Sequence, residues 1–239
     1  GYDIRIFSAP DRYIAGERNA MMSAIEGRAK LQPVIRRPSA GVSGINGYPT
    51  LVQNVETFYD IALSNRDQFQ GKRLATLNGN VQHPGVHEVH SDDSVKTVLE
   101  KTKNWPDFDF FVQVGGGASG YIYNRRQIET QKLVGCGSID IIPADTSYKD
   151  LMIKWFKFFS IESCGLCVPC YKGAPQIRDL VLNSNSDADI PWAEILKLTY
   201  KAKKGSFCGL GVSFSFPVES LIQNVIFERA ENSPPPSAS

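Results

Sequence analysis

The spacing of hydrophobic and polar residues changes twice along the chain and predicts three kinds of region. In the first region, apolar and polar residues alternate over residues 1–7, which predicts a strand. Apolar residues then recur at helical spacing over residues 17–27, where Gly27 is well placed to end a helix, and a second helix is predicted over residues 54–64. A Gly/Pro/Ser-rich loop at 36–50 separates the two helices. Together these elements make part of an α/β domain rather than a whole one.

The middle of the chain has shorter elements, in the order strand, turn, strand, helix, strand. Pro84 and Gly85 supply the turn signal between the first two strands. This order is that of a small β-grasp domain. The predicted strands lie at 72–81, 83–89 and 107–114, and the predicted helix lies at 94–102.

From Tyr148 onward the pattern is helical. A first helix is predicted over residues 149–160, because its apolar side chains form one broad stripe. A second helix begins near Pro191 and stops at Gly205, and a third covers residues 216–230. The stripe of the first helix consists of Leu151, Met152, Trp155, Phe156 and Phe159.

The sequence therefore predicts a mixed fold of α+β and α/β character in three parts. We expect a partial α/β segment at 1–67, a β-grasp domain at 68–145 and a C-terminal helical bundle at 146–230. The tail at 231–239 is too polar and too rich in proline to pack. The chain begins with Gly rather than Met, so we expect a processed product or a piece of a longer polypeptide.

Composition excludes several classes of function. The 239 residues are long enough to bury real cores, and the formal charge of +1 is spread along the chain, which argues against nucleic-acid binding. No apolar run approaches the ~18 residues of a membrane span, and no signal peptide is evident. We expect a soluble protein of the cytoplasm or of an equivalent reducing compartment such as the mitochondrial matrix, at most peripheral to a membrane complex.

Four of the five cysteines form one pattern: Cys164, Cys167 and Cys170 are three residues apart, and Cys208 follows much later. A 4Fe–4S cube offers four irons, each of which takes one thiolate. Three cysteines in a short loop, which Gly165 helps to curl, can reach three irons, and a distant segment must supply the fourth ligand. We therefore predict one 4Fe–4S cluster held by these four cysteines.

Zinc is the main alternative, because four thiolates also satisfy it. Structural zinc sites usually take their ligands as two pairs, whereas this chain divides them three and one. Unligated buried thiols would leave the spacing unexplained, and the long gap excludes a two-cluster ferredoxin pattern. Cys136 lies between two glycines, and we expect it to be a small residue in a tight bend.

With these residues identified, the chain resembles the C-terminal half of the NADH-binding flavoprotein subunit of respiratory complex I and its relatives in NAD-linked hydrogenases and formate dehydrogenases. Three ordered stretches carry the resemblance across about 200 residues. They are RYIAGERNAMMSAIEGR, GINGYPTLVQNVET, and ESCGLCVPCYKG with the later FCGLG and FPVESLI. The resemblance implies that 1–67 is the C-terminal part of a flavin- and NADH-binding domain.

The resemblance also implies residues that border flavin and nicotinamide. These are Gly16, Glu17, Arg18, Gln53 and Asn54. Arg18 stands where the family usually has a second glutamate, and Gln53 stands where it has the first of two asparagines. A positive charge at residue 18 favours the extra phosphate of NADP or indicates a decayed nucleotide site.

The family's Gly-rich loop, whose backbone amides hold the flavin phosphate, should precede residue 1. We therefore expect the chain alone to hold FMN weakly or not at all, and to need the missing half for activity. As the resemblance implies, NAD(P)H would reduce FMN, and electrons would pass singly to the 4Fe–4S cluster. The implied partners are other redox subunits, including a 2Fe–2S subunit. The catalytic residues are unknown.

A rival hypothesis makes the chain a structural or assembly subunit, in which the cluster only holds the helices together and the nucleotide site has decayed.

The Gly-rich GGGASG at 115–120 fits the dinucleotide-binding pattern literally, but an aromatic, strand-like YIYNRR follows it where a helix is required. His87 and His90 should point to opposite faces of a strand, so they and His83 are expected on the surface rather than around a metal.

Overall fold

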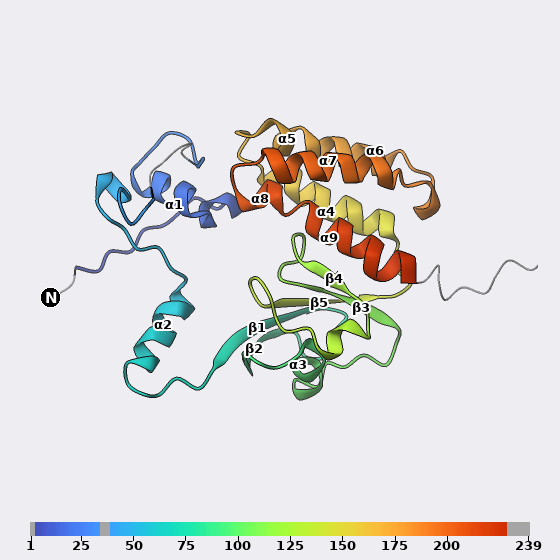
Figure 1. Ribbon diagram of the computed structural model, residues 1–239, viewed down its shortest axis with the longest axis horizontal. Coiled ribbons are helices and arrows are strands. Elements are labelled where there is room, and N and C mark those ends of the chain that lie inside the picture. The colour runs from blue at the N-terminus through green and yellow to red at the C-terminus, as the bar shows by residue number, and fades with distance from the viewer. Residues whose placement is uncertain (1–2, 34–38, 229–239) are drawn as a thin grey trace, which may run out of the picture.

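The computed structural model of the protein describes residues 3–33 and 39–228, and a mixed five-stranded sheet with a helical bundle packed on one face forms its main body (Figure 1). The strands are ordered β2-β1-β5-β3-β4 across the sheet. β1 and β5 are parallel, whereas the other neighbouring pairs are antiparallel. The strands are β1 (Lys72–Gly79), β2 (Gly85–His90), β3 (Phe110–Val114), β4 (Tyr121–Tyr123) and β5 (Ser138–Pro143).

Alternation along β3 explains how the sheet can cover two cores. Phe110, Val112 and Val114 pack into an apolar cluster on the side of α3 (Val95–Lys101). Phe111, one residue out of phase, packs with the helical bundle instead. Because successive strand residues point to opposite faces, a strand with every residue buried lies in the middle of the molecule.

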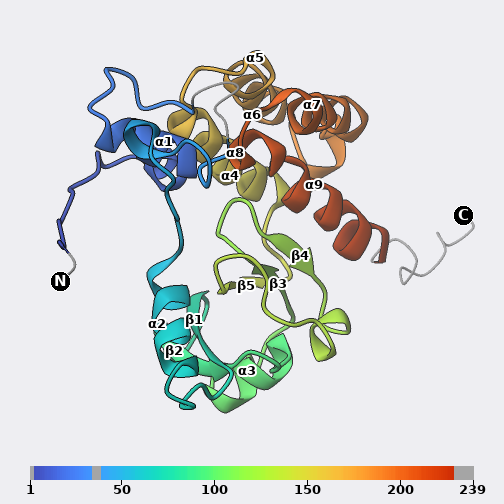
Figure 2. The same cartoon turned by 60° about the vertical axis from the view of Figure 1, so that its left-hand side comes forward.

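The C-terminal bundle begins with α4, whose predicted apolar stripe is buried as expected. Figure 2 shows the bundle helices stacked above the sheet. The third predicted helix is divided, because α9 runs into a short π-helical turn at Ile222–Ile226. Sequence analysis did not predict α6. The bundle comprises α4 (Tyr148–Glu162), α5 (Val168–Tyr171), α6 (Gly173–Leu182), α7 (Trp192–Gly205), α8 (Gly209–Val212) and α9 (Ser215–Leu221).

The edge of the sheet at β4 is closed by α9 and the turn after it. The Ile122 backbone N–H donates to Ser220 Oγ at 2.8 Å, and the Asn224 side-chain amide donates to the Ile122 carbonyl at 2.7 Å. Tyr121 stacks on Phe216 with ring centroids 4.8 Å apart. These contacts satisfy backbone groups that an exposed edge strand would leave open to pairing with another chain.

The N-terminal region packs least well. It contains α1 (Arg18–Ile25) and α2 (Val55–Ser64), with short 3₁₀ turns at Tyr13–Gly16 and Ile45–Gly47. Gly27 follows α1 with a φ of +69°, as the predicted helix end requires.

The strand predicted at 1–7 is wrong for the described residues 3–7, which form no strand. Ile4 is 88% exposed and Ile6 is 97% exposed, because no neighbouring strand in the described part of the chain pairs with them. Residues 1–2, residues 34–38 with the first part of the loop predicted at 36–50, residues 229–230 of the last predicted helix and the tail at 231–239 lie outside the described residues.

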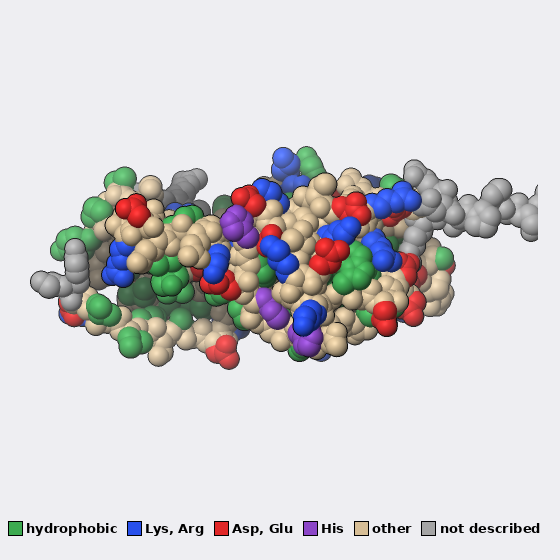
Figure 3. Space-filling view, turned by 90° about the horizontal axis from the view of Figure 1, so that it is seen from below, with side chains coloured by type: hydrophobic (Ala, Val, Ile, Leu, Met, Phe, Trp, Pro, Cys, Tyr) green, Lys and Arg blue, Asp and Glu red, His purple; other side chains and the backbone are tan. Residues whose placement is uncertain are grey.

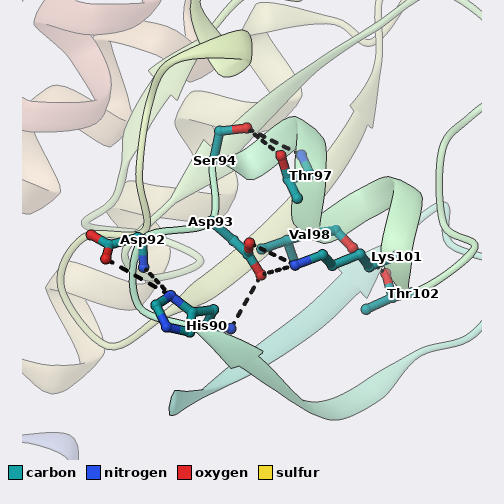
Figure 4. A network of polar contacts seen from close by, with 8 residues as sticks. All are labelled: His90, Asp92, Asp93, Ser94, Thr97, Val98, Lys101 and Thr102. Carbon is teal, nitrogen blue, oxygen red and sulfur yellow. Dashed lines mark hydrogen bonds and ion pairs between the residues drawn. The ribbon is translucent and has the colours of Figure 1, made fainter. Parts of the chain in front are cut away.

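Two sequence features that were not expected to bind a ligand, GGGASG and His90, have structural roles. GGGASG leads into β4 rather than a helix, as expected, so it lacks the context of a dinucleotide fingerprint. His90 helps to shape the connection between β2 and α3 (Figure 4). Its ring accepts a hydrogen bond from the Asp92 backbone N–H at 3.2 Å, and the His90 backbone N–H donates to the Asp93 carboxylate at 3.1 Å. Ser94 then caps α3 by accepting from the Thr97 N–H.

A buried hydrogen bond joins the sheet to the bundle. Trp155 Nε1 of α4 donates to Gln113 Oε1 of β3 at 3.1 Å, and Gln113 Nε2 donates to the Gly120 carbonyl at 3.2 Å. Trp155 is 0% exposed and Gln113 is 1% exposed. Both amide ends of Gln113 are therefore used inside the protein.

We expect Gln113→Leu to lower the free energy of unfolding by about 1–3 kcal/mol, because it leaves the buried Trp155 N–H without an acceptor. Urea denaturation followed by tryptophan fluorescence measures the change. Gln82→Leu is the control, since Gln82 is exposed and the same substitution there removes no buried contact. Equal stability of the two variants would contradict a stabilising role for the hydrogen bond between Gln113 and Trp155.

Candidate metal centre

The three clustered cysteines lie where α4 ends and α5 begins. α4 stops at Glu162, and the chain turns through Gly165, whose φ of +80° is one that residues with a side chain rarely adopt. Pro169 lies in the first turn of α5, where its missing N–H costs nothing. Cys164 is partly exposed on this loop, whereas Cys167 and Cys170 are buried.

The fourth cysteine reaches the same place from a different segment. Cys208 lies between the end of α7 and the start of α8 and is partly buried. The Phe207 backbone N–H donates to Cys167 Sγ at 3.3 Å, which ties the second segment directly to the first. α5 packs against both α7 and α8. The helix order therefore brings the two cysteine segments together.

Close approach of the two segments depends on glycines. A Cβ on Gly211 of α8 would lie 3.1 Å from the Cβ of Cys170 and would overlap the side chain of Ser206. A Cβ on Gly205 would lie 2.8 Å from Cγ of Pro169. Both distances are shorter than ordinary van der Waals contact, so any side chain at these positions would push the cysteine segments apart.

Three of the four thiols have pKa values raised by burial. Burial raises the pKa of Cys170 to about 11, and the other three cysteines add to this effect although the Ser163 hydroxyl, 3.4 Å from the sulfur, opposes it. Burial also raises the pKa of Cys167 and of Cys208, while backbone N–H groups near each sulfur pull in the opposite direction. Because only thiolates ligate metals, positive charge at this place is needed to hold them deprotonated.

Four thiolates can hold either a single metal ion or a cluster, and the two need different distances between the sulfurs. In the part of the chain that the structure describes, no three His, Cys, Asp or Glu side chains are close enough to hold one metal ion. Around zinc, four sulfurs at about 2.3 Å from the metal would lie only about 3.8 Å apart. In a 4Fe–4S cube each cysteine binds a different iron, so the four cysteine sulfurs lie farther apart than around a single zinc ion.

One polar atom beside the cysteines has no partner of its own. Ser206 Oγ is buried and makes no hydrogen bond to any described residue. It lies on the side of Gly211 that also faces Cys170. A buried hydroxyl without a partner is costly, and a cluster sulfur is an acceptor that would satisfy it. The donor set and its surroundings therefore fit an iron–sulfur cluster.

The residues expected to border flavin and nicotinamide lie at two helix starts. Glu17 caps α1 by accepting from the Ala20 N–H at 2.8 Å, and Asn54 caps α2 by accepting from the Glu56 N–H at 2.8 Å. Gly16 and Gln53 precede these caps, and Gly16, Arg18, Gln53 and Asn54 are exposed. No hydrogen bond among the described residues joins the two groups, so their shared role stays a prediction.

Sequence analysis missed the contacts that tie the N-terminal region to the cysteine loop. The Tyr13 N–H donates to Glu162 Oε2 at 3.0 Å, and Arg12 Nη2 donates to the Ile161 carbonyl at 2.7 Å. Gln32 Nε2 donates to the carbonyl of Cys164 at 2.6 Å. These partners are far apart in the sequence, and no local pattern signals their pairing.

The remaining candidates do not join the site. Cys136 is exposed in the loop before β5, apart from the other four cysteines. His83 and His90 are exposed and His87 is partly buried.

Comparison with known proteins adds a family match over the bundle. Residues 150–229 match the family model of the NADH-ubiquinone oxidoreductase-F iron–sulfur binding region. This range includes all four clustered cysteines and most of α4 through α9. The resemblance inferred from the sequence motifs is confirmed, and an iron–sulfur binding region is shown for this part of the chain.

Longer relatives are similar over nearly the whole chain. An NADH-quinone oxidoreductase subunit of Mycobacterium tuberculosis is 26% identical over 260 residues, covering 94% of this chain and 56% of the relative. NADP-reducing hydrogenase subunit HndC of Solidesulfovibrio fructosivorans is 29% identical over 250 residues, covering 92% of this chain and 50% of the relative. The chain thus spans about half the length of the curated relatives it matches.

Solved structures show the same fold. The chain superposes on an NAD⁺-reducing [NiFe]-hydrogenase in its H₂-reduced state with a TM-score of 0.77 and 24% identity, over 94% of this chain and 42% of that one. The match supports the mixed α/β fold expected from the sequence. None of the helices in the described residues is long and apolar enough to cross a membrane.

We expect Gly211→Ala to lower the free energy of unfolding by about 1–3 kcal/mol, because its methyl group would meet Cys170 and Ser206. Thermal unfolding of the metal-free chain measures this change, and iron content after anaerobic reconstitution should fall in parallel.

Gly209→Ala is a matched control in the same short helix, since nothing lies within 4 Å of a Cβ at that position. If the two alanine variants unfold alike and retain equal iron, close packing at Gly211 is not what brings the cysteine segments together.

Proposed function

We propose that this chain is the electron-transfer part of an NAD(P)H-dependent oxidoreductase, passing electrons from a flavin to a 4Fe–4S cluster within a multisubunit assembly. The observation that carries the proposal is the meeting of Cys164, Cys167 and Cys170 with Cys208 inside the matched iron–sulfur region. Those four cysteines would hold the cluster, which when bound supplies a one-electron carrier.

The chain's own residues would set the properties of that carrier. The Phe207 N–H donates to Cys167 Sγ, and the hydroxyls of Ser163 and Ser206 lie beside Cys170. Hydrogen bonds to the sulfurs and exclusion of water are the main levers on the potential of such a cluster.

The contacts between the N-terminal region and the cysteine loop support a short path from flavin to cluster. Arg12 and Tyr13 lie a few residues before the Gly16–Arg18 segment, and both donate to Glu162, two residues before the first cysteine. Gln32 holds the Cys164 backbone itself. We therefore place Gly16, Glu17, Arg18, Gln53 and Asn54 at the border of the flavin and nicotinamide site.

The proposed parts keep the boundaries expected from the sequence: 1–67 completes a flavin domain, 68–145 is a β-grasp domain, and 146–230 binds the cluster. The first part needs a partner, because many of its large apolar side chains are exposed. Figure 3 shows hydrophobic side chains around a hollow at the N-terminal end of the molecule. The exposed large apolar residues of 1–67 include Ile6, Val42, Tyr48, Leu51, Val55 and Tyr59.

We infer that the half of the relatives' length outside this chain covers that surface and supplies the flavin phosphate site. HndC is named as an NADP-reducing subunit. The exposed cation of Arg18 would suit the additional phosphate of that cofactor, so both nicotinamide cofactors belong in any test. Other redox subunits, including a 2Fe–2S subunit, would take the electrons onward.

A structural or assembly role remains the second candidate, and one observation favours it. The side chains of Glu17 and Asn54 both serve as helix caps, so their presence needs no nucleotide to explain it. An assembly subunit would still bind the cluster. It would differ in its response to reduced cofactor.

We expect Cys208→Ser to lose most of the cluster, because the second segment then offers no thiolate. Iron and sulfide content and visible absorbance after anaerobic reconstitution measure the loss. Cys136→Ser is the control and should retain the cluster. Wild-type chain that takes up zinc or no metal, or a Cys136→Ser variant that loses iron equally, would contradict the ligand assignment.

The whole assembly, isolated without oxygen, decides between the two functions. We expect NADH or NADPH to bleach its visible iron–sulfur absorbance, and Arg18→Glu to shift the preference from NADPH toward NADH by removing a phosphate-binding cation. An assembly that contains iron and flavin but that neither cofactor bleaches would favour the structural role.

A further inference from the structure

Both cysteine segments expose an apolar side chain next to a cysteine. Val168, which follows Cys167, is 60% exposed, and Phe207, which precedes Cys208, is also 60% exposed. Apolar side chains this exposed are ordinary when single, but here two of them flank the same buried group. The wall between the cysteines and solvent is therefore thin and apolar at this place.

A cleft of about 520 Å³, lined in part by Val168, opens between α5 with the start of α6 on one side and the C-terminal half of α7 on the other. Pro169 and Gly205, which touch where the two helices meet, lie at its base. Tyr200, 57% exposed, contributes its ring to the wall. The lining is thus mainly apolar, and it contains Val168 and Pro169 between two of the cysteines and Gly205, three residues before Cys208.

Three lysines surround the cleft: Lys172, Lys201 and Lys204. None has a carboxylate within salt-bridge distance among the described residues, and no carboxylate lines the cleft. Lys172 lies 5.4 Å from the ring of Tyr171, and Lys204 lies 5.7 Å from the ring of Tyr200. The cleft is therefore positively charged at its rim although the whole chain carries a net charge of only +1.

We propose that this cleft is the docking surface for another redox protein of the assembly, one that presents an apolar side chain ringed by carboxylates. An apolar centre with a charged rim is the usual anatomy of a protein interface, and opposite charges orient the partner. The inference rests on the proposed function, since it places the exit for electrons beside the cluster ligands.

Charge decides against two other occupants. A second copy of this chain would bring lysines against lysines at a self-complementary contact, which is repulsive. A nucleic acid would use the lysines but not the apolar wall, and it would bind through a much larger basic field. An acidic protein partner uses both features.

Lysine footprinting of the native assembly tests the surface. The tagged full chain is isolated with its partners at low salt, acetylated with an amine-reactive reagent, and compared by mass spectrometry with the isolated chain. We expect Lys172, Lys201 and Lys204 to be shielded in the assembly. Lys157, exposed on α4, is the reference. Equal reactivity of the three lysines in both samples overturns the proposal.

A charge-reversed variant adds a second readout. The double substitution Lys201→Glu and Lys204→Glu should weaken the association at least about tenfold, since opposing like charges cost more than the roughly 1.4 kcal/mol that a factor of ten represents. Lys157→Glu should leave it unchanged. Circular dichroism confirms that each variant is folded, and undiminished binding by a folded double variant also overturns the proposal.

The docking surface and the proposed function fail separately. An assembly that NAD(P)H reduces, but in which the three lysines stay fully reactive, overturns only the docking surface. Shielded lysines in an assembly without iron support the surface while overturning electron transfer through a cluster.

Discussion

The fold of the C-terminal half depends on bringing two distant cysteine segments into contact. The Phe207 N–H reaches the sulfur of Cys167, and Gly211 lets α8 approach Cys170 more closely than any residue with a side chain could. Burial raises the pKa of Cys167, Cys170 and Cys208, so without a metal these thiols stay protonated and cannot act as ligands. The arrangement makes physical sense as a site that a metal cluster completes.

Around this centre, the three regions are joined by a few polar contacts between apolar surfaces. Trp155 and Gln113 connect the bundle to the sheet through a buried hydrogen bond. Tyr13 and Gln32 connect the N-terminal region to the cysteine loop through Glu162 and the Cys164 carbonyl. Both joints end within or directly after α4, which therefore acts as the common support of the molecule.

The apolar surfaces that remain exposed are distributed unevenly. The sheet and bundle bury continuous clusters, whereas α2 buries none of its residues. An amphipathic helix gains most of its stability from packing, so α2 is expected to be stabilised by a surface beyond this chain. The relatives are about twice as long, which gives such a surface a natural source. The cleft beside α5 differs, because its rim is basic and its lining adjoins the cysteines.

Local patterns in the sequence predicted several features correctly, among them the stripe of α4, the helix end at Gly27, and the spacing of Cys164, Cys167 and Cys170. Each of these follows from neighbours within a few residues. In contrast, β5, α5, α6 and α8 were not predicted, and Gly85, expected in a turn, begins β2. The strand predicted at 1–7 was wrong because the pattern there is purely local. Ile4 and Ile6 alternate as strand residues do, but no strand in the described part of the chain pairs with them. The cysteine pattern also predicted that Cys208 joins the other three, but only the tertiary structure decided that the Phe207 N–H reaches Cys167, that Glu162 receives Tyr13, and that Gln113 faces Trp155. These contacts join residues separated by dozens of positions or more, and their geometry is set by how helices and strands pack, which no local pattern specifies.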